Sequence, residues 1–567
     1  MKTQALKLHI LGISGVFATL LLLTTSIVAQ PLPITKYWLG FKDKAGTPYT
    51  TATPEAFLSA KAIERRQNYN ISLTESDLPV SPQYVQALQN LGIQVLYTSK
   101  WLNGAVVYVN DSNLLAQAKA LPFVLGARGV SNLKKAKQTP VSIQMKTLQN
   151  DINYIDSLYY GTAFRQIQML NGDYLHAYGF DGEGMTIAIL DAGFSGVDTN
   201  PAFQTHFANG QIKGVRDFVD FDGNVYAHAN HGAQVFSILG ANLPGSYVGA
   251  APAADVWLIR TEDGQTETLI EEYNWVAGAE LADSVGADII NSSLGYSQFD
   301  YQDMNYTYDN MDGNTAISTR GADMAAAKGI LVVNSAGNSG NKPWHYITAP
   351  ADADSILAVG AVDSLGNYAF FSSTGPSSDG NVKPNVAAQG LMTAYVDVDG
   401  TLRRGNGTSF SSPIIAGMVA CLWQANRSYS NMDIIRIVEQ SSSQAEQPDS
   451  LKGFGIPDFY KAMKAMGVYP SSAQQGELSA AFAYPNPFTD DINVYYYSAV
   501  GGNIKVTLFD LAGKKLFELN NIVSAKTPYR FSLAGNNDYA HRILDGGMYI
   551  LQITDSNGSK NIKVIKE

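Results

Sequence analysis

Short apolar runs alternate with longer segments of helical periodicity across residues 185–466. The runs have the length of buried strands, and the helical pattern is clearest at residues 268–285 and 316–328. The strand-like runs are residues 185–190, 256–259, 289–290, 329–333 and 356–362. Strands that alternate with helices favour a parallel sheet covered by helices on both faces. The fold class predicted for this region is therefore α/β.

Residues 30–130 carry a different pattern, which predicts a small α+β unit. Strands are expected at residues 37–41 and 93–97, and helices at residues 54–66, 81–91 and 113–120. A polar stretch follows at residues 131–151, and its lysines are Lys134, Lys135, Lys137 and Lys146. We expect this stretch to be a linker that contains a processing site.

From about residue 478 the pattern changes to short strands separated by turns. Residues 506–509 and 515–519 flank one turn, and residues 548–553 and 561–565 flank Asn557-Gly558. Because Asn-Gly is a strong hairpin signal and several short strands follow one another, we predict a small β-sandwich.

The N-terminus has the pattern of a signal peptide. Lys2 and Lys7 precede the apolar residues 10–23, and small residues lead to Ala29, the expected last residue before cleavage. The apolar stretch is short for a membrane span, and no later run reaches the roughly 20 apolar residues that a span requires. We therefore expect an exported protein with no integral membrane segment in the mature chain.

Composition narrows the classes of function. A chain of 567 residues with 45% hydrophobic and 16% charged residues is expected to fold into several domains. The net charge of -11 and the lack of a Lys/Arg-rich patch argue against nucleic acid as a partner. The one cysteine, Cys421, cannot form an internal disulfide and is expected to be a small buried residue. We expect a monomer.

Ser409 is a candidate nucleophile. It follows Gly407 and precedes the apolar residues 414–423, which predict a buried helix. A serine there lies in the positive field of a helix N-terminus, beside unpaired backbone N–H groups. Those are suitable conditions for a nucleophile next to an oxyanion site. The alternative is that Ser409 only caps the helix.

A serine nucleophile needs a base and a carboxylate that orients the base. Asp191 ends the apolar run 185–190, at the carboxyl end of a predicted strand, where open α/β sheets place their sites. His231 begins an apolar helical pattern beside a glycine, so one face of its ring can stay open. Asp198 lies in a Gly/Asn/Pro turn and is expected to be solvated, and His228 is expected to be an ordinary satisfied histidine.

Asn338 is a candidate oxyanion donor. It lies in a Gly/Ser-rich loop after residues 329–333, and a neutral amide N–H can stabilise a developing alkoxide without competing for its proton. The alternative is that Asn338 only adopts a left-handed turn, which asparagine tolerates.

The order Asp191, His231, Ser409 is that of the subtilisin triad. Together with Ser293-Leu294-Gly295 and Ala336-Gly337-Asn338, these segments resemble the subtilisin-like serine proteases, the subtilase (S8) family, over residues 160–465. The resemblance implies that Ser409 attacks the scissile carbonyl and that His231 is the general base and then the general acid.

The resemblance also assigns the remaining roles. Asp191 would orient His231, and Asn338 would hold the oxyanion with the backbone N–H of Ser409. Ser293, Leu294 and Gly295 would bind the substrate backbone and form part of the pocket before the scissile bond. The chemistry would need no cofactor. The residues after Asp191, His231-Gly232 and Ser409 depart from the usual family pattern, which affects packing and preference rather than the mechanism.

An insertion at residues 295–316 is rich in Tyr and Asp. Its carboxylates are Asp300, Asp303, Asp309 and Asp312, with Asn310 and Asn314 nearby. Hard cations prefer oxygen ligands, so structural calcium is a candidate ligand of this loop. No EF-hand spacing is present, and solvated loop acids are the alternative.

The C-terminal segment resembles the sorting domain of type IX secretion in Bacteroidetes. The resemblance rests on Tyr484-Pro485-Asn486-Pro487-Phe488, the Asp510-Leu511-Ala512-Gly513-Lys514 turn and Gly546-Gly547-Met548-Tyr549. It implies contact with the type IX secretion machinery and a secreted or cell-surface location. The alternative is a carbohydrate-binding or adhesive β-module.

These resemblances predict four parts: a signal peptide (1–29), a propeptide with its linker (30–150), a subtilisin-like peptidase domain (151–470) and a C-terminal sorting domain (478–567). The alternative for the second part is a permanent N-terminal domain. The predicted function is a secreted serine endopeptidase that cleaves protein or peptide substrates. A non-catalytic peptide-binding scaffold and a peptide ligase or macrocyclase that uses the same serine remain alternatives.

Overall fold

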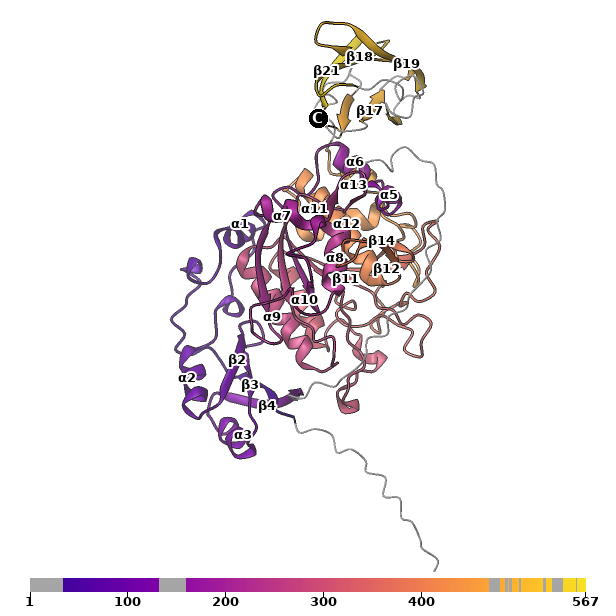
Figure 1. Ribbon diagram of the computed structural model, residues 1–567. Helices are drawn as coiled ribbons and strands as arrows, with labels where there is room; N and C mark the ends of the chain where they lie inside the picture. Colours follow the sequence, from indigo (N-terminus) through magenta and orange to yellow (C-terminus); the bar gives the residue numbers. More distant parts are fainter. Residues whose placement is uncertain are drawn as a thin grey trace, which may run out of the picture. The chain divides into compact units, whose positions relative to one another are not determined.

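The structure is a computed structural model. It describes residues 34–131, 160–468 and 480–566, the last with gaps at 485–487, 489–491, 499–500, 524–526, 533–543 and 557 (Figure 1). The predicted signal peptide, the lysine-bearing linker and Asn557 lie outside the described residues. None of the described helices is both long and apolar enough to span a bilayer.

A seven-stranded parallel sheet forms the centre of residues 160–468, with the strand order β13-β12-β11-β10-β5-β9-β6. The strands are β5 (Thr186–Asp191), β6 (Ile212–Asp217), β9 (Asp255–Arg260), β10 (Ile289–Ser292), β11 (Leu331–Ser335), β12 (Leu357–Val362) and β13 (Val386–Gln389). Because the strands are parallel, their carboxyl ends meet at one edge of the sheet. The residues that follow these ends therefore lie near one another.

The apolar runs predicted as strands are buried on both faces. In β5, Ile187 and Ile189 pack in one core cluster, whereas Ala188 and Leu190 pack in the other. The first cluster includes α8 (His231–Gly240) and α11 (Thr408–Ala425), and the second includes α9 (Ile270–Val285) and α10 (Ile317–Ala327). Since successive side chains of a strand point to opposite faces, two helical layers explain the continuous apolar runs. The predicted fold class is confirmed.

Smaller elements surround this sheet. They are α5 (Phe164–Gln168), α6 (Asp173–Ala177), η3 (Pro201–Phe203), α7 (Gln204–Ala208), β7 (Asn242–Leu243), β8 (Tyr247–Val248), η4 (Gln302–Met304), η5 (Tyr308–Asn310), β14 (Thr393–Val396), β15 (Leu402–Gly405), α12 (Asn431–Ser441) and α13 (Phe459–Ala465). Hairpin β14–β15 is antiparallel and contributes Ala394 and Val396 to the core that α11 shares.

The N-terminal unit contains an antiparallel sheet in the order β2-β3-β1-β4. Its elements are β1 (Lys36–Phe41), α2 (Pro82–Asn90), β2 (Gln94–Ser99), β3 (Gly104–Tyr108), α3 (Ser112–Lys119) and β4 (Val124–Ser131). Residues 42–80 are inserted between β1 and α2 and contain η1 (Pro54–Ala56), α1 (Ala60–Asn68) and η2 (Glu75–Asp77).

The single helix predicted at residues 54–66 is wrong. Ser59 interrupts it, because its extended backbone cannot continue a helix and its side chain accepts a hydrogen bond from the N–H of Ala62. The serine therefore caps α1, and only the short turn η1 precedes it.

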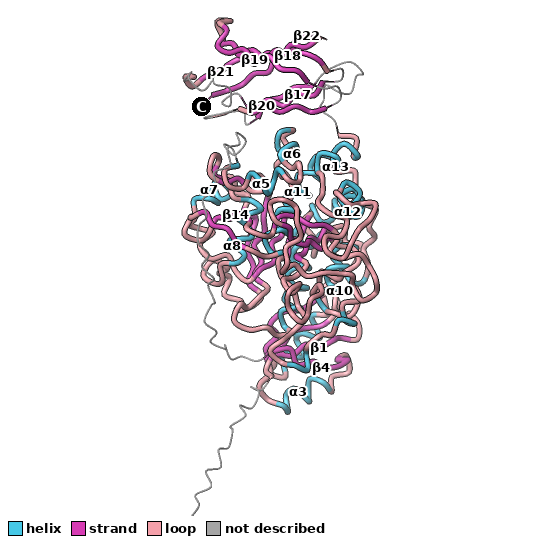
Figure 2. The backbone as a smooth tube through the Cα atoms, turned by 90° about the vertical axis from the view of Figure 1, so that its right-hand side faces the viewer, coloured by secondary structure: helices cyan, strands magenta, loops and turns pink. Residues whose placement is uncertain are grey.

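The C-terminal unit has two antiparallel sheets, in the orders β16-β17-β20 and β19-β18-β21-β22. Figure 2 shows β17 and β20 in one layer and β18, β19 and β22 in the other. The strands are β16 (Ala480–Tyr484), β17 (Asn493–Ser498), β18 (Gly502–Asp510), β19 (Lys515–Val523), β20 (Thr527–Ser532), β21 (Gly547–Asp555) and β22 (Gly558–Lys566). Val494 of one sheet and Val506 and Leu551 of the other belong to one core cluster. Two sheets that share a core form the predicted β-sandwich.

Candidate active site

Asp191 and His231 form a hydrogen-bonded pair at the carboxyl edge of the parallel sheet. Asp191 is the last residue of β5, is fully buried, and accepts a 2.8 Å hydrogen bond on Oδ1 from Nδ1 of His231. The N–H of Ala192 donates to the same oxygen at 2.8 Å. The other oxygen, Oδ2, is buried without a hydrogen-bond partner among the described residues. The pair fixes the ring orientation and leaves Nε2 for other contacts.

His231 is the first residue of α8, and its side chain is 35% exposed. Burial disfavours the charged imidazolium, but the charge and the hydrogen bond of Asp191 outweigh it, so the pKa of His231 is raised above its usual value. The neighbouring Gly232 is required at its position, because a Cβ there would lie 2.5 Å from the carbonyl oxygen of Gly193 and 2.9 Å from Cβ of Asp191. Because glycine has no side chain, the first turn of α8 can pack directly against Asp191 and the loop that follows it.

Ser409 is the second residue of α11 and does not cap it. The N-cap is Gly407, which has no side chain, and the hydroxyl of Ser409 donates to the carbonyl of Ser293 at 3.3 Å. The alternative that Ser409 is only a capping residue is therefore wrong. As a residue of the first helical turn, Ser409 also has a backbone N–H without a partner inside the helix. Such an N–H can bind an anion.

Pro413 lies inside α11, four residues after Ser409. A proline has no N–H, so the carbonyl of Ser409 lacks the helical hydrogen bond that this residue would otherwise donate. The hydroxyl of Ser293 donates to that carbonyl at 3.0 Å. Ser293 and Ser409 are thus joined by two hydrogen bonds, one in each direction.

Asn338 lies in the loop after β11, close to the start of α11. Its Oδ1 accepts hydrogen bonds from the backbone N–H of Thr408 at 2.8 Å and from the Thr408 hydroxyl at 3.1 Å. The left-handed residue of this loop is Gly337, with φ of 110°, so the alternative of a left-handed Asn338 is wrong. With Oδ1 occupied, the amide Nδ2 donates to no other described residue and is left as a donor beside Gly407.

An aromatic contact places His231 beside the start of α11. The ring of Phe410 lies 6.4 Å from that of His231 and 5.2 Å from that of Tyr395, measured between centroids. In the described part of the chain the Ser409 hydroxyl is hydrogen-bonded to Ser293 and not to His231. The four candidate catalytic residues therefore converge on one edge of the sheet. Thr408, Phe410 and Pro413 were missed as contributors, although they lie in the Ser409 motif itself.

Ser293, Leu294 and Gly295 follow the end of β10 directly. The carbonyl of Leu294 accepts a hydrogen bond from Nδ2 of Asn334 at 3.1 Å. At Gly295 a Cβ would lie 2.2 Å from Oγ1 of Thr348, so only glycine fits. These contacts hold the segment as a fixed edge next to Ser409.

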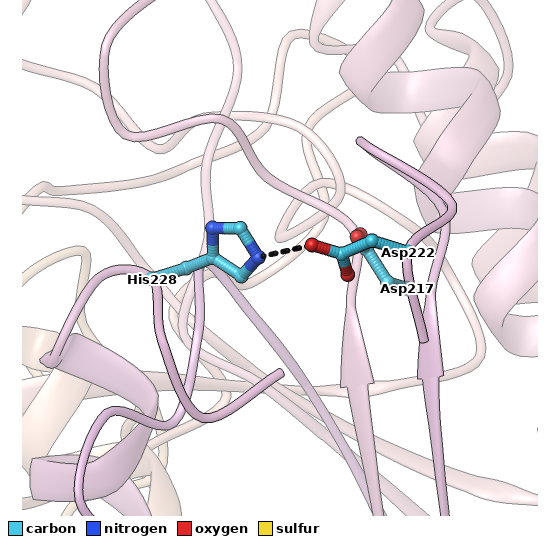
Figure 3. Close-up of side chains that lie close together, drawn as sticks. All are labelled: Asp217, Asp222 and His228. Atoms are coloured by element: carbon cyan, nitrogen blue, oxygen red, sulfur yellow. Dashed lines mark ion pairs between the residues drawn. The ribbon is translucent and has the colours of Figure 1, made fainter. Parts of the chain in front are cut away.

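Two groups of carboxylate and histidine side chains converge closely enough to hold a metal ion among the described residues, and neither includes the acids of the 295–316 insertion. The first is Asp217, Asp222 and His228, where Nε2 of His228 lies 3.5 Å from Oδ2 of Asp222 (Figure 3). The Arg260 guanidinium already lies 3.3 Å from both Asp217 oxygens, so a cation is present beside this group. The guanidinium also donates to the carbonyl of Ala192 at 3.1 Å and thereby supports the Asp191 loop.

The second group is Glu262, Glu267 and Glu271, which lies between β9 and the start of α9. Burial and the neighbouring carboxylates raise the pKa of all three, that of Glu267 to about 8. Carboxyl groups that share a buried place in this way are stable when some are protonated. The hydroxyl of Tyr296 donates to Glu262 at 2.9 Å.

The remaining sequence candidates have structural roles. Asp198 is exposed. Cys421 is fully buried in α11, with Sγ 3.3 Å from the carbonyl of Ala250, and burial raises the pKa of its thiol far above the usual value. A buried thiol of that kind is not a nucleophile. In the insertion, Asp312 accepts hydrogen bonds from the N–H groups of Asn314 and Thr315.

Three family descriptions match the chain. "Subtilase family" matches residues 182–456, "Peptidase S8 propeptide domain, Bacteroidota" matches residues 36–146, and "Secretion system C-terminal sorting domain" matches residues 483–567. These matches confirm both resemblances and the propeptide that the first of them predicts. The matches also favour the propeptide over the alternative of a permanent N-terminal domain. They favour the sorting domain over the alternative of a carbohydrate-binding or adhesive β-module.

Curated relatives agree with these matches. The chain is 32% identical to Subtilisin DY of Bacillus licheniformis over 259 residues, which cover 45% of this chain and 82% of that protein. It is 28% identical to Subtilisin E of Bacillus subtilis (strain 168) over 332 residues, or 57% and 77% of the two chains. The crystal structure of MycP1 from Mycobacterium smegmatis is similar at 22% identity, with a TM-score of 0.40 and coverage of 52% and 84%. The chain belongs to the subtilase family and is a serine endopeptidase with a propeptide and a C-terminal sorting domain.

Proposed function

We propose that this endopeptidase hydrolyses peptide bonds through a triad of Ser409, His231 and Asp191. Nε2 of His231 takes the proton of the Ser409 hydroxyl as Oγ forms a bond to the scissile carbonyl carbon. The resulting imidazolium gives that proton to the leaving amine, and an acyl-enzyme remains. Water, deprotonated by the same histidine, then releases the acid and restores Ser409. The hydrogen bond between His231 and Asp191 is the observation that carries this proposal.

Charge develops on the carbonyl oxygen in the tetrahedral intermediate. Two donors support its stabilisation: the N–H of Ser409 and the amide Nδ2 of Asn338, which Thr408 orients through the other end of the amide. Asp191 stabilises the imidazolium and keeps the proton on Nδ1. The chemistry requires no metal ion in this proposal.

Ser293, Leu294 and Gly295 are proposed to bind the substrate backbone on the acyl side of the scissile bond. They form the fixed edge that is hydrogen-bonded to Ser409. Extended peptides are recognised in this way by edge backbone, with side-chain pockets adding preference. Protein and peptide substrates are therefore proposed, and Ser293, Leu294 and Gly295 are proposed to form part of the pocket for the residue before the cut.

The sorting domain points to a secreted or cell-surface location and implies the type IX secretion machinery as a partner. We further propose the domain limits 1–29, 30–150, 151–470 and 478–567 and a monomeric mature enzyme. Structural calcium at the 295–316 loop stays a prediction beside the alternative of solvated acids, since the acids of this loop do not converge among the described residues. Release of the propeptide by cleavage in the linker would open the site.

The first experiment treats processed protein with a fluorophosphonate probe and with an unfolded protein substrate. Ser409→Ala is compared with Ser411→Ala, a variant of another buried serine of the same helix turn. We expect labelling and cleavage in the wild type and in Ser411→Ala, and neither in Ser409→Ala. Labelling retained in Ser409→Ala would place the nucleophile elsewhere. Labelling with transfer to added amines instead of hydrolysis would favour the ligase alternative, and a folded protein with no labelling would favour the scaffold.

A further inference from the structure

Two short segments leave the carboxyl ends of neighbouring strands and both reach the start of α11. Residues 293–295 follow β10 and residues 336–338 follow β11, the strand beside it in the sheet. The first segment is bound to α11 by the two hydrogen bonds between Ser293 and Ser409. The second is bound there through Asn338, whose Oδ1 accepts from the first residue of the helix. The gap between the two segments therefore has the proposed nucleophile at one end.

The other end of this gap is occupied by Thr348. A Cβ on Gly295 would lie 2.2 Å from Oγ1 of Thr348, and a Cβ on Gly337 would lie 3.0 Å from the same oxygen. A side chain on either glycine would therefore collide with this hydroxyl or crowd it. The hydroxyl lies between the two segments, in the room that the two absent side chains leave.

The backbone ties Thr348 to both segments. Its N–H donates to the carbonyl of Ala336, in the second segment, at 3.3 Å. The next residue, Ala349, exchanges two backbone hydrogen bonds of 2.7 and 3.1 Å with Tyr296, which directly follows the first segment. Since Thr348 is held from both sides of the gap, it cannot move aside when a ligand enters.

The two ends of the gap differ in exposure. Gly295 is exposed, and Gly337 and Asn338 are partly exposed, whereas Thr348 is only 6% exposed. The Thr348 hydroxyl is buried and has no hydrogen-bond partner among the described residues. An unpaired buried hydroxyl is unfavourable for folding, so hydrogen bonding within the protein does not account for a threonine here. What the side chain supplies is volume at the closed end of the gap.

We propose that Thr348 closes the pocket for the residue before the cut and that the enzyme therefore selects short side chains there, chiefly those of alanine and serine. This rests on the proposed assignment of residues 293–295 to that pocket. A substrate whose carbonyl is held at Ser409 places the preceding side chain in the gap, and Thr348 ends the gap before a leucine or phenylalanine side chain fits. Because both neighbouring wall positions are glycines, Thr348 and not the walls sets the length of the pocket.

The test measures kcat/KM of the processed protease on peptides that differ only in the residue before the cut, which is alanine, leucine, phenylalanine or glutamine. The residues before the cuts in an unfolded protein are identified by mass spectrometry as a second readout. Thr348→Ala and Thr348→Ser are compared with Thr393→Ala. Thr393 is a buried threonine of β14 whose hydroxyl donates to the carbonyl of Gln389 at 2.9 Å, away from both segments. Thermal unfolding on the Ser409→Ala background identifies variants that have not folded.

We expect the wild type to cleave the alanine peptide on the order of 10-fold faster than the leucine peptide, or more, because a pocket discriminates by about this factor for each methylene. Thr348→Ala should lower this ratio on the order of 10-fold, chiefly through faster cleavage of the leucine peptide. Thr348→Ser keeps the oxygen but loses the methyl group, so its ratio should lie between the two. Thr393→Ala should keep the wild-type ratio.

A wild-type preference for leucine or phenylalanine would overturn the proposal, and so would an unchanged ratio in folded Thr348→Ala. A preference for glutamine over alanine would also overturn it, because it would assign the Thr348 hydroxyl to hydrogen bonding with the substrate. The products give the residue before the cut whichever side chain is the nucleophile. Fluorophosphonate labelling that persists in Ser409→Ala would therefore contradict the proposed triad alone, whereas a preference for long side chains with labelling confined to Ser409 would contradict the role of Thr348 alone.

Discussion

The hydroxyl of Ser293 donates a 3.0 Å hydrogen bond to the carbonyl of Ser409, the residue proposed as the nucleophile. That carbonyl is free to accept because Pro413 has no N–H to offer it. Both serines are more than nine-tenths buried. The start of α11 is therefore bound to the end of β10 by a side chain, at the point where the helix lacks its own hydrogen bond.

Ser293→Ala is expected to leave the Ser409 carbonyl unpaired. A buried acceptor without a partner costs about 1–3 kcal/mol, so thermal unfolding on the Ser409→Ala background should show a loss of this size. In the active protein we expect kcat to fall as well, because the Ser409 backbone is less firmly held. An unchanged melting temperature would show that water or the backbone replaces the serine without cost.

Pro413→Ala provides the matched control for that variant. An alanine at 413 restores an N–H that can bond to the Ser409 carbonyl, so Ser293→Ala should cost less in the presence of Pro413→Ala than alone. The difference is the coupling free energy of a double-mutant cycle, and we expect about 1 kcal/mol. A coupling energy near zero would show that the two residues act on different groups.

Asn338→Ala and Asn338→Asp are expected to separate the two ends of this side chain. Removal of one oxyanion donor costs about 2.7–4 kcal/mol in kcat, a range known from a subtilisin, with little change in KM. Aspartate keeps an oxygen for the Thr408 contacts but places a negative charge at the oxyanion, so its kcat should be lower still. Steady-state kinetics on a peptide substrate measure kcat and KM for both variants. A KM effect larger than the kcat effect would assign Asn338 to substrate binding instead.

Thr408→Val is expected to act through Asn338. It removes the hydroxyl that donates to Oδ1 of Asn338 at 3.1 Å and accepts from the N–H of Gly337, the residue before Asn338, at 3.1 Å, but it keeps the backbone bond to Oδ1 at 2.8 Å. We therefore expect a fall in kcat smaller than that of Asn338→Ala, and almost no further fall when the two changes are combined. Additive losses in the double variant would show that Thr408 acts independently.

The rate should depend on pH through His231. The base must be neutral, and Asp191 raises its pKa, so kcat/KM should fall as the pH falls through a value above the usual 6.5. Asp191→Asn removes the charge that raises this pKa, so the acid limb of the profile should move to lower pH while kcat drops about 10⁴-fold. An acid limb that stays in place in the variant would assign it to another group.

Much of the peptidase core could be predicted from sequence because a strand buried on both faces leaves a simple apolar signal. Residues 185–190 were expected as a strand, and β5 is Thr186–Asp191. Asp191 and His231 are far apart in the chain, but they could still be paired from sequence, because the carboxyl ends of parallel strands and the helices that begin after them meet at one edge of the sheet. The sequence pattern could not predict the order of the strands in the sheet. The pairing of Ser293 with Ser409 depends on that order, because it requires the end of β10 to lie beside the start of α11.

Contacts between separate parts of the chain were also beyond the pattern. The helix predicted at residues 54–66 was expected to be one continuous element, yet Ser59 divides it and Arg65 binds residues more than 200 positions away. No local periodicity encodes such a partner. The interruption itself had a signal, because serine is a preferred N-cap residue.

His206 should make the folded protein sensitive to acid. It is fully buried, neither ring nitrogen has a hydrogen-bond partner among the described residues, and burial lowers its pKa to about 4. Its pKa in the unfolded chain is about 6.5, so the unfolded state binds more protons as the pH falls between these values. The free energy of unfolding is therefore unaffected by His206 above about pH 6.5. It falls as the pH drops below that value, and the loss is complete once the pH has fallen through about 4.

His206→Leu removes the titrating group from this site, where the ring of His206 meets that of Phe236 edge-on at 5.2 Å. Denaturant unfolding of the variant and its parent, both with Ser409→Ala to prevent autolysis, should be compared at pH 8 and pH 4.5. The difference at pH 8 measures the packing effect alone, because the histidine is neutral in both states. At pH 4.5 the variant should gain about 2 kcal/mol relative to that difference. Burial also lowers the pKa of His176 to about 4, and this histidine remains in both proteins. Part of the acid sensitivity should therefore persist in the variant. An equal difference at the two pH values would show that the ring is protonated in place or reaches water.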